Sequence, residues 1–350
     1  MILFLSKYPQ TDKEFRDGFF QRVVNIDSFY KEDKRVYLDV QLFRNFKKKT
    51  IDSGKDRIEY SCNLFLHLFF IISIYKKSNL VYIQSLHNAL YNFLFIKFID
   101  NKYVLDLHGV VPEELSLQGL NMKSKLFALI ETIIFAKLDI CIAVTNRLAK
   151  HYCLKYPKAK AKYITYAILP NNLESIGTIE TDSKIVNVIY SGNTQAWQNV
   201  DLMLKTISQN ISDNIHYTIL TGELDIMKSL LVKSKLDNLV SINVLSVQPS
   251  QLSEYYQKAN YGFILRDDIT VNNVACPTKL VEYLNYGIIP IVLSDKIGDF
   301  KELGYEYISV QDFSVDLPIL KSKINQKLVE NFRIINSLNL KDRIYYLLNQ

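Results

Sequence analysis

Short β-rich runs alternate with longer helical stretches along almost the whole chain, and this alternation restricts the possible folds more than any other feature. In the first half we expect strands at 2–5, 36–42, 80–83, 103–107, 140–144 and 162–166, and helices near 14–30, 62–76, 90–99, 124–137 and 147–155. Strands that alternate with helices in this way form βαβ units on a parallel sheet. The sequence therefore predicts an α/β fold.

A second alternating set follows a polar, turn-rich stretch. Its expected strands lie at 185–190, 217–221, 242–244, 261–265 and 288–293, with helices near 200–210, 224–234, 249–258 and 277–285. A chain of 350 residues is also longer than one compact core usually covers. We therefore predict an N-terminal Rossmann-like domain over 1–168, a linker over 169–183, a C-terminal Rossmann-like domain over 184–324, and a C-terminal helix over 325–350 that packs back on the first domain.

The predicted architecture is two tandem doubly wound Rossmann-like domains that face each other across a cleft. In open parallel sheets, ligands bind outside the carboxyl ends of the strands. We therefore look for functional residues in the loops that follow strands, and we expect the cleft to hold the site.

Composition and missing motifs exclude several function classes. The net charge is +6, from 42 basic and 36 acidic residues, which does not indicate a nucleic-acid partner. The sequence contains no G-x-G-x-x-G, G-x-x-x-x-G-K-[ST], G-x-S-x-G or H-E-x-x-H, so we expect no dehydrogenase, P-loop NTPase, α/β-hydrolase or zinc protease. It has no D-x-D either, and we expect neither a metal nor another cofactor.

The cysteines and the first residues indicate a cytoplasmic protein. No two of the four cysteines stand at C-x-x-C spacing. The apolar start at 1–5 is followed at once by Ser6-Lys7-Tyr8-Pro9, which is unlike a signal peptide. Free buried thiols in a reducing compartment are the simplest interpretation.

The run 44–57 contains six basic and two acidic residues. It is either a solvated loop or a patch that meets an anionic membrane surface or a diphosphate-linked lipid. The apolar run that follows, 63–75, is shorter than the ~20 residues of a membrane span, so we expect a buried helix packed on the sheet. If the basic patch is functional, the protein is peripheral on the inner membrane.

The segment 261–293 reads as strand, long loop, helix and strand. Pro277 suits the first turn of the helix, and the free N–H groups of that turn form a site for an anion. Lys279 lies in the same turn, where a cation is unfavourable for the helix dipole, so its presence indicates an anionic partner. Glu282 follows on the same helix face. The other interpretation is a surface ion pair on a packing helix.

This segment resembles the C-terminal half of the group 1, or family 4, retaining glycosyltransferases of the GT-B fold. Those enzymes carry two glutamates separated by seven residues, followed by a helix and a G-x-P-V-[IV] strand. Glu282 matches the second glutamate and 287–292 matches the strand, whereas Val274 occupies the position of the first glutamate. The usual contact with the donor sugar's hydroxyls is therefore missing.

The resemblance implies a nucleotide-sugar donor bound by the C-terminal domain, with Glu282 on the ribose. The family's R-x-x-x-x-K after the first strand of this domain is absent, so Arg266 and Lys279 are expected to contact the phosphates. The loop 191–199 keeps a glycine at the strand's end, where backbone can approach a phosphate. The expected donor site comprises Gly192, Asn193, Arg266, Pro277, Thr278, Lys279 and Glu282.

The segment D-L-H-G-V-V-P-E-E at 106–114 follows an expected strand and resembles the N-domain loop of the same family. In the family this histidine contacts the donor sugar near the reacting carbon, and His108 takes that role by resemblance. A lone histidine can equally be structural. Glu113 and Glu114 position the loop or the acceptor, or cap a helix behind Pro112. Tyr8 and Arg16 are the nearest candidates to line the acceptor side.

We therefore expect a retaining, metal-independent, hexosyltransferase-like enzyme. It would move a sugar from a nucleotide-diphosphate sugar to a hydroxyl of a glycan or a polyprenyl-diphosphate-linked acceptor in surface-polysaccharide biosynthesis. Two alternatives remain open from the sequence. One is a sugar-nucleotide epimerase of the same fold, and the other is a non-catalytic GT-B partner subunit, which the missing first glutamate allows.

Overall fold

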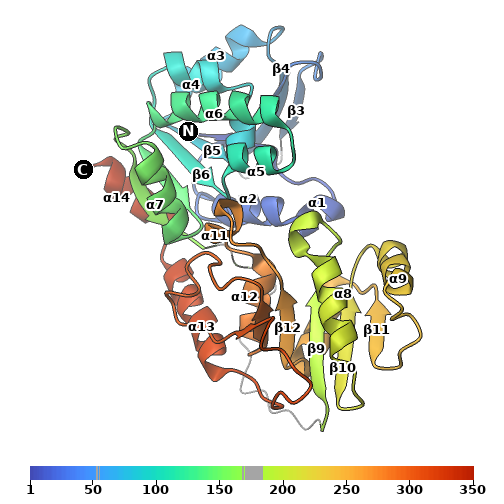
Figure 1. Ribbon diagram of the computed structural model, residues 1–350. Coiled ribbons are helices and arrows are strands. Elements are labelled where there is room, and N and C mark those ends of the chain that lie inside the picture. Colours follow the sequence, from blue (N-terminus) through green and yellow to red (C-terminus); the bar gives the residue numbers. More distant parts are fainter. Residues whose placement is uncertain (53, 55, 168, 170–183) are drawn as a thin grey trace. The chain divides into compact units, whose positions relative to one another are not determined.

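The structure is a computed structural model that describes residues 1–52, 54, 56–167, 169 and 184–350, without the side chains of Lys13, Arg16 and Ala196. The chain forms two compact units, shown in Figure 1. The N unit comprises Met1–Ile168 and Asn336–Gln350, and the C unit comprises Leu169–Ile335. Apart from Leu169, the predicted linker lies outside the described residues.

The N unit is built on an eight-stranded sheet of order β3-β4-β2-β1-β5-β6-β7-β8. Neighbouring strands are parallel except for β3, which pairs antiparallel with β4 at the edge. Along the sheet the strands are β3 (Lys49–Asp52), β4 (Arg57–Asn63), β2 (Arg35–Gln41), β1 (Ile2–Leu5), β5 (Leu80–Gln84), β6 (Tyr103–Leu107), β7 (Ile140–Ala143) and β8 (Lys162–Thr165). The strand order reverses between β1 and β5, which is the switch point of a doubly wound sheet.

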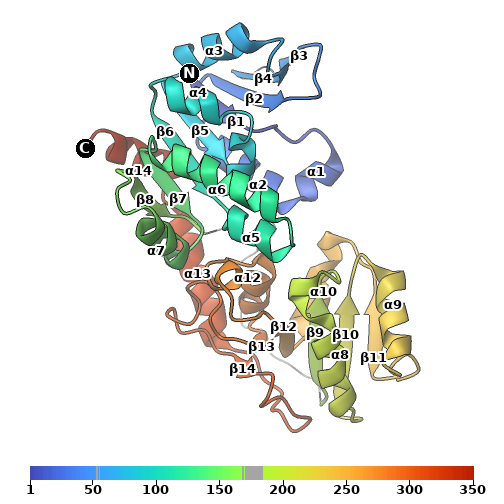
Figure 2. The same ribbon diagram turned by 45° about the horizontal axis from the view of Figure 1, so that its top comes forward.

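Helices cover both faces of this sheet. Because parallel connections are right-handed, helices on the path from β4 to β8 lie on one face, and those between β1 and β2 lie on the other. The first face carries α3 (Leu68–Lys77), α4 (Phe93–Phe98), α5 (Val111–Leu117), α6 (Asn121–Phe135) and α7 (Asn146–Lys155). Figure 2 shows α4 and α6 in front of β5 and β6. The second face carries α2 (Gly18–Ser28) and α14 (Leu340–Leu348), whose apolar residues share one core with β1, β5 and β7.

The structure divides the predicted helix at 14–30 in two. Thr11 caps α1 (Asp12–Arg16) through a capping box with Glu14. Asp17 then ends α1 and caps α2, because its side chain accepts the N–H groups of Phe19 and Phe20. A single residue with a short acceptor side chain therefore stops one helix and starts the next.

The predicted helix at 62–76 is wrong in its first part. Residues up to Asn63 continue β4, and the helix begins only at Leu68. The Asn63 side chain accepts the N–H groups of Phe65 and Leu66 and so forms the turn between the two elements. The run 44–57 is not a plain loop either, since it contains β3.

The C unit has a six-stranded parallel sheet of order β11-β10-β9-β12-β13-β14. Its strands are β9 (Val186–Ser191), β10 (Ile215–Leu220), β11 (Ile242–Leu245), β12 (Tyr261–Ile264), β13 (Ile289–Val292) and β14 (Ile308–Ser309). The predicted strands are therefore confirmed to within a few residues, and β14 is an addition. The order reverses between β9 and β12, and this pair of strands is the switch point where ligands bind in such sheets.

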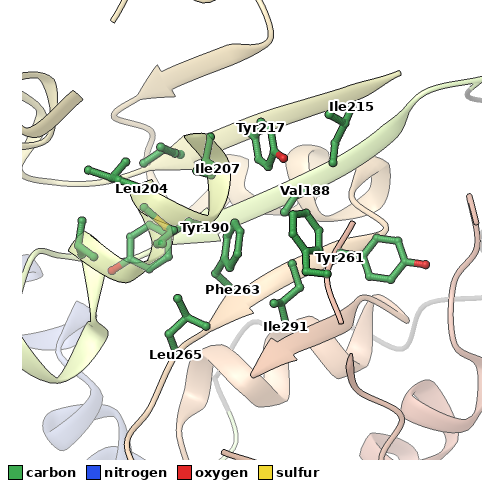
Figure 3. Packing of buried hydrophobic residues seen from close by; sticks show 14 of the residues in the cluster. Val188, Tyr190, Leu204, Ile207, Ile215, Tyr217, Tyr261, Phe263, Leu265 and Ile291 are labelled. Carbon is green, nitrogen blue, oxygen red and sulfur yellow. The ribbon is translucent and has the colours of Figure 1, made fainter. Parts of the chain in front are cut away.

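Two helices, α8 (Val200–Gln209) and α9 (Leu224–Lys233), pack on one face of this sheet. Figure 3 shows the core beneath them, where side chains of β9, β10, β12 and β13 meet, including Tyr217, Phe263 and Ile291. The connection from β11 to β12 carries α10 (Leu252–Lys258). The connection from β12 to β13 carries the short α11 (Thr270–Asn273) and α12 (Thr278–Asn285). The predicted helical tail forms two helices, α13 (Lys323–Ser337) and α14.

Candidate functional site

Several predicted donor-site residues lie near the carboxyl ends of β9 and β12, the two strands at the switch point of the C-unit sheet. Gly192 follows β9 directly, and Arg266 follows β12 after one residue. Lys279 and Glu282 come from α12, the helix that follows the β12 loop. The fold therefore gathers four of the predicted donor-site residues from three separate segments.

Gly192 and Lys279 are in direct contact. A Cβ atom at position 192 would overlap Lys279 Nζ, so a side chain there would displace the ammonium group. Lys279 Nζ also lies 4.4 Å from the centroid of the Tyr190 ring and donates a hydrogen bond to Gln198 Oε1 at 3.2 Å. The ammonium group is thus held against the glycine by an aromatic ring and one neutral acceptor.

The Lys279 ammonium group is short of negative charge. Burial lowers the pKa of Lys279, the nearby Arg266 guanidinium lowers it further, and Glu282 offsets only part of this, so its pKa is about 7. Burial also lowers the pKa of Arg266. Among the described residues neither cation forms an ion pair, and Arg266 donates instead to the neutral Asn272 Oδ1 at 3.2 Å. Two adjacent desolvated cations are unfavourable alone and favour an anion between them.

Lys279 belongs to the first turn of α12, and Arg266 lies in the loop that precedes this helix. Its N-cap residue is Pro277, which makes no side-chain capping bond, and Thr278 is exposed at the first helical position. The first-turn N–H groups of an eight-residue helix therefore add to the positive potential of the same region.

Glu282 lies one turn further along α12 and is half-buried. Its carboxylate accepts a hydrogen bond from Tyr256 Oη at 3.0 Å, and burial raises its pKa. The next residue, Tyr283, fixes the helix to the sheet, because its Oη accepts the Ser191 N–H at 2.9 Å. This bond joins the end of β9 to α12, and it holds the Gly192 loop and the Lys279 helix in register.

A cavity of about 190 Å³ opens at the carboxyl ends of β9 and β10. None of its lining residues is charged: Ser191, Gly192, Leu220, Thr221, Gly222, Val247, Pro249 and Leu252. Gly192 thus belongs both to this neutral cavity and to the contact with Lys279. Asn193 closes the turn beside it, since its carbonyl oxygen accepts the Tyr190 hydroxyl.

His108 follows β6 in the N unit and lies next to the buried ion pair of Arg22 and Asp106. Arg22 Nε and Nη2 donate to the Asp106 carboxylate at 2.8–3.1 Å, and Tyr82 Oη donates to it at 3.0 Å. Burial raises the pKa of Asp106, but the charge of Arg22 and the neighbouring His108 hold it below its usual range. His108 Nε2 lies 3.8 Å from Asp106 Oδ2, and its ring lies 5.5 Å from that of Phe19.

The two glutamates after His108 have different surroundings. Glu114 Oε1 accepts the Val110 N–H at 3.0 Å and fills the space beside Gly109, so it shapes the His108 loop. Glu113 instead pairs with Lys155 Nζ at 2.8 Å, which ties it to α7. The loop-positioning prediction thus suits the contacts of Glu114, while those of Glu113 are with another helix.

The acceptor-side candidates are less well defined. The Arg57 guanidinium carbon lies 3.6 Å above the Tyr8 ring, and Tyr37 packs edge-on against the same ring. The Arg16 side chain lies outside the described part of the chain. Sequence reasoning missed Arg22, which bonds to a residue 84 positions away. It also missed Gln84, a fully buried residue at the end of β5 whose side-chain amide finds no hydrogen-bond partner among the described residues.

Among the residues that the structure describes, no helix has the length and apolar character needed to span a membrane. The same residues contain no group of three His, Cys, Asp or Glu side chains that could hold a metal ion.

Solved structures of the GT-B glycosyltransferase fold match the chain over nearly its whole length, and the chain has this fold. No family model matches the sequence, and no curated protein matches it.

Three of these structures illustrate the likeness. The sucrose-phosphate synthase of Thermosynechococcus elongatus has 11% identity and a TM-score of 0.68, with 99% of this chain and 98% of that chain covered. The apo form of the lipopolysaccharide outer core galactosyltransferase WaaB has 11% identity and a TM-score of 0.67, with 99% of each chain covered. Anabaena HepE in complex with UDP and glucose has 13% identity and a TM-score of 0.65, with 99% of each chain covered.

Proposed function

We propose that the protein is a glycosyltransferase that moves a sugar from a nucleotide-diphosphate sugar to a hydroxyl group. The observation that carries this proposal is the pair of desolvated cations at the switch point of the C unit, Lys279 and Arg266, neither of which forms an ion pair with a described carboxylate. A diphosphate supplies the missing negative charge. A solved structure of the same fold supports this class of ligand, since HepE was solved with UDP-glucose and with UDP and glucose.

Each part of a sugar nucleotide has a counterpart in the C unit. The diphosphate would contact Lys279, Arg266 and the first N–H groups of α12, and Gly192 lets it approach the backbone. Glu282 would accept hydrogen bonds from the ribose diol, in exchange for the one it now accepts from Tyr256. The neutral cavity of about 190 Å³ is suited to the uncharged base.

The reaction requires negative charge to develop on the leaving diphosphate as the bond to the anomeric carbon breaks. Lys279 and Arg266 stabilise that charge without a metal, because they are preorganised and poorly solvated. His108 is assigned to the sugar near its reacting carbon, as the family resemblance implies, together with retention of the anomeric configuration. The Asp106 carboxylate, which Arg22 binds, lies 3.8 Å from His108 Nε2.

We further propose that the enzyme is hexosyltransferase-like, cytoplasmic, and active in surface-polysaccharide biosynthesis. The acceptor would be a glycan or a polyprenyl-diphosphate-linked saccharide bound by the N unit, where Tyr8 lies near the end of β1. A lipid-linked acceptor would bring the enzyme to the inner face of the membrane.

The test combines binding and turnover for a panel of nucleoside diphosphates and their sugar derivatives. We expect one donor to raise the melting temperature of the wild-type protein and to release nucleoside diphosphate on incubation. For Glu282→Ala the shift in melting temperature should be much smaller, because the ribose loses its carboxylate acceptor.

Glu254→Ala is the matched control, because Glu254 is an exposed glutamate on the neighbouring helix α10. It should behave like wild type in both measurements. Equal shifts for wild type and Glu282→Ala would remove Glu282 from the site. A panel in which no donor binds or is cleaved would contradict the proposed function.

The low pKa of Lys279 predicts a pH dependence of binding. At a pH above about 7 the free protein holds Lys279 mostly neutral, whereas a bound diphosphate favours the charged form. Binding then takes up a proton, so affinity should fall as pH rises from 7 to 9, by up to about tenfold per pH unit. The measurement is calorimetry at pH 8.5 in two buffers of different ionisation enthalpy, which reports the protons bound.

Lys279→Met provides the comparison, because it retains the apolar stem and removes the titrating group. The variant should bind more weakly and show little proton uptake over this range. An affinity for nucleoside diphosphate that is constant from pH 7 to 9 in the wild type would show that Lys279 does not face the phosphates.

A further inference from the structure

The N unit carries an exposed aromatic surface on the side of α3 and α4. Phe69 is 85% exposed and Phe98 is 73% exposed, values unusual for such large apolar side chains. The surface is defined by Phe43, Phe46, Phe65, Leu66, Phe69, Leu94 and Phe98, each about half exposed or more. We call it the aromatic surface. The helix expected at 63–75 to be buried on the sheet is therefore buried on one face only, through Ile71, Ile74 and Tyr75.

Hydrogen bonds of Asn63 bring two parts of this surface together. Its side-chain amide donates to the carbonyl oxygens of Leu42 and Arg44, on either side of Phe43. Its side-chain oxygen accepts the N–H groups of Phe65 and Leu66. One buried residue therefore fixes the loop after β2 against the turn before α3.

Aromatic contacts extend the surface along the sheet. Lys48 Nζ lies 4.0 Å from the centroid of the Phe70 ring, which packs edge-on against Tyr60. This contact joins Lys48, which directly precedes β3, to α3. On the other side of α3, Tyr75 donates to Asn92 at 3.0 Å and so holds the start of α4. In Figures 1 and 2, α3, α4 and α6 follow one another on the same side of the sheet.

Basic residues predominate along the segments that form this surface, and exposed aspartates stand only where these segments end, at Asp52 and Asp100. The sequence contains no Asp or Glu at 40–51 and none at 60–99. The exposed basic residues of these segments are Arg44, Lys47, Lys48, Lys49, Lys76, Lys77 and Lys97. Exposed aromatic and basic side chains on the same segments match the two layers of an anionic membrane surface, the acyl boundary and the headgroups.

We propose that the aromatic surface docks the protein on a lipid bilayer that contains anionic headgroups. The aromatic side chains enter the interfacial layer, and the lysines bind the headgroups. Charge complementarity selects this partner over a second copy of the chain, because a copy would bring the same basic residues against each other. The proposal builds on the proposed lipid-linked acceptor and adds the surface by which the enzyme reaches it.

Co-sedimentation with vesicles tests the proposal. We expect binding to phosphatidylcholine vesicles that contain about 30% phosphatidylglycerol, little binding to pure phosphatidylcholine, and a loss of binding as salt rises. Phe65→Ser/Phe69→Ser should lower the partition coefficient at least about tenfold, because two exposed aromatic rings are lost. Lys47→Glu/Lys49→Glu should do the same and should remove most of the salt dependence.

The matched control is Ile226→Ser/Val232→Ser, which removes two exposed apolar residues from α9 in the C unit. It should bind vesicles like wild type. Equal binding of all variants, or no binding to anionic vesicles at low salt, would overturn the proposal. So would a dimer in sedimentation velocity that Phe65→Ser/Phe69→Ser dissociates, because the surface would then be an interface between copies.

Donor cleavage in the absence of vesicles separates this proposal from the proposed function. If Phe65→Ser/Phe69→Ser cleaves the donor like wild type but does not bind vesicles, both proposals hold. If the wild type binds anionic vesicles and cleaves no donor, docking stands and the glycosyltransferase proposal fails. If the wild type cleaves the donor but binds no vesicle, the docking proposal fails.

Discussion

Replacing Lys279 by methionine is expected to lower kcat by about 10²–10³-fold, the effect of removing one preorganised electrostatic contact. Its ammonium group lies against Gly192 and beside Arg266, where burial leaves it poorly solvated. Charge on the leaving diphosphate grows as the glycosidic bond breaks, so the contact strengthens in the transition state. Binding of the intact donor should therefore weaken less than kcat falls.

Arg266→Met should show the same pattern, and one turnover assay with one calorimetric titration per variant measures both effects. Lys228→Met is a suitable control, because Lys228 is exposed on α9. If the loss in kcat/KM for Lys279→Met comes entirely from weaker donor binding, the residue contributes uniform binding and does not act on the leaving group.

Replacing His108 by alanine is expected to lower kcat on the order of 10²-fold and to leave the affinity for free nucleoside diphosphate nearly unchanged. His108 lies in the N unit, and the nucleotide is assigned to residues of the C unit. The side chain has a ring contact with Phe19 and approaches Asp106 at 3.8 Å, while Asp106 keeps its hydrogen bonds from Arg22, so we expect the Arg22–Asp106 pair to stay intact. Melting temperature should therefore change little.

His216→Ala is the control, because His216 is an exposed histidine on β10 of the C unit, outside the residues assigned to the site. It should retain wild-type turnover. If His108→Ala abolishes nucleotide binding or leaves turnover unchanged, the assignment to the sugar fails, and His108 is a structural residue of the Asp106 cluster.

The local pattern was sufficient for most of the strands and for the site helix. Pro277, Lys279 and Glu282 occupy the start and one face of α12, as their spacing predicts. Local pattern was insufficient between β2 and α3. There Asn63 ends a strand and forms a turn inside an apolar run that reads equally well as one helix.

The sequence by itself determined the α/β class, the two sets of strands, and the positions of Gly192, Arg266 and His108 directly after strands. These properties follow from periodicity and turn residues, which are local along the chain. Only the tertiary structure decided which of these residues meet. The contact of Gly192 with Lys279, the bond from Arg22 to Asp106, and the exposure of Phe65 and Phe69 depend on strand order and helix packing. Such contacts join residues far apart in sequence, and no short segment specifies its distant partner.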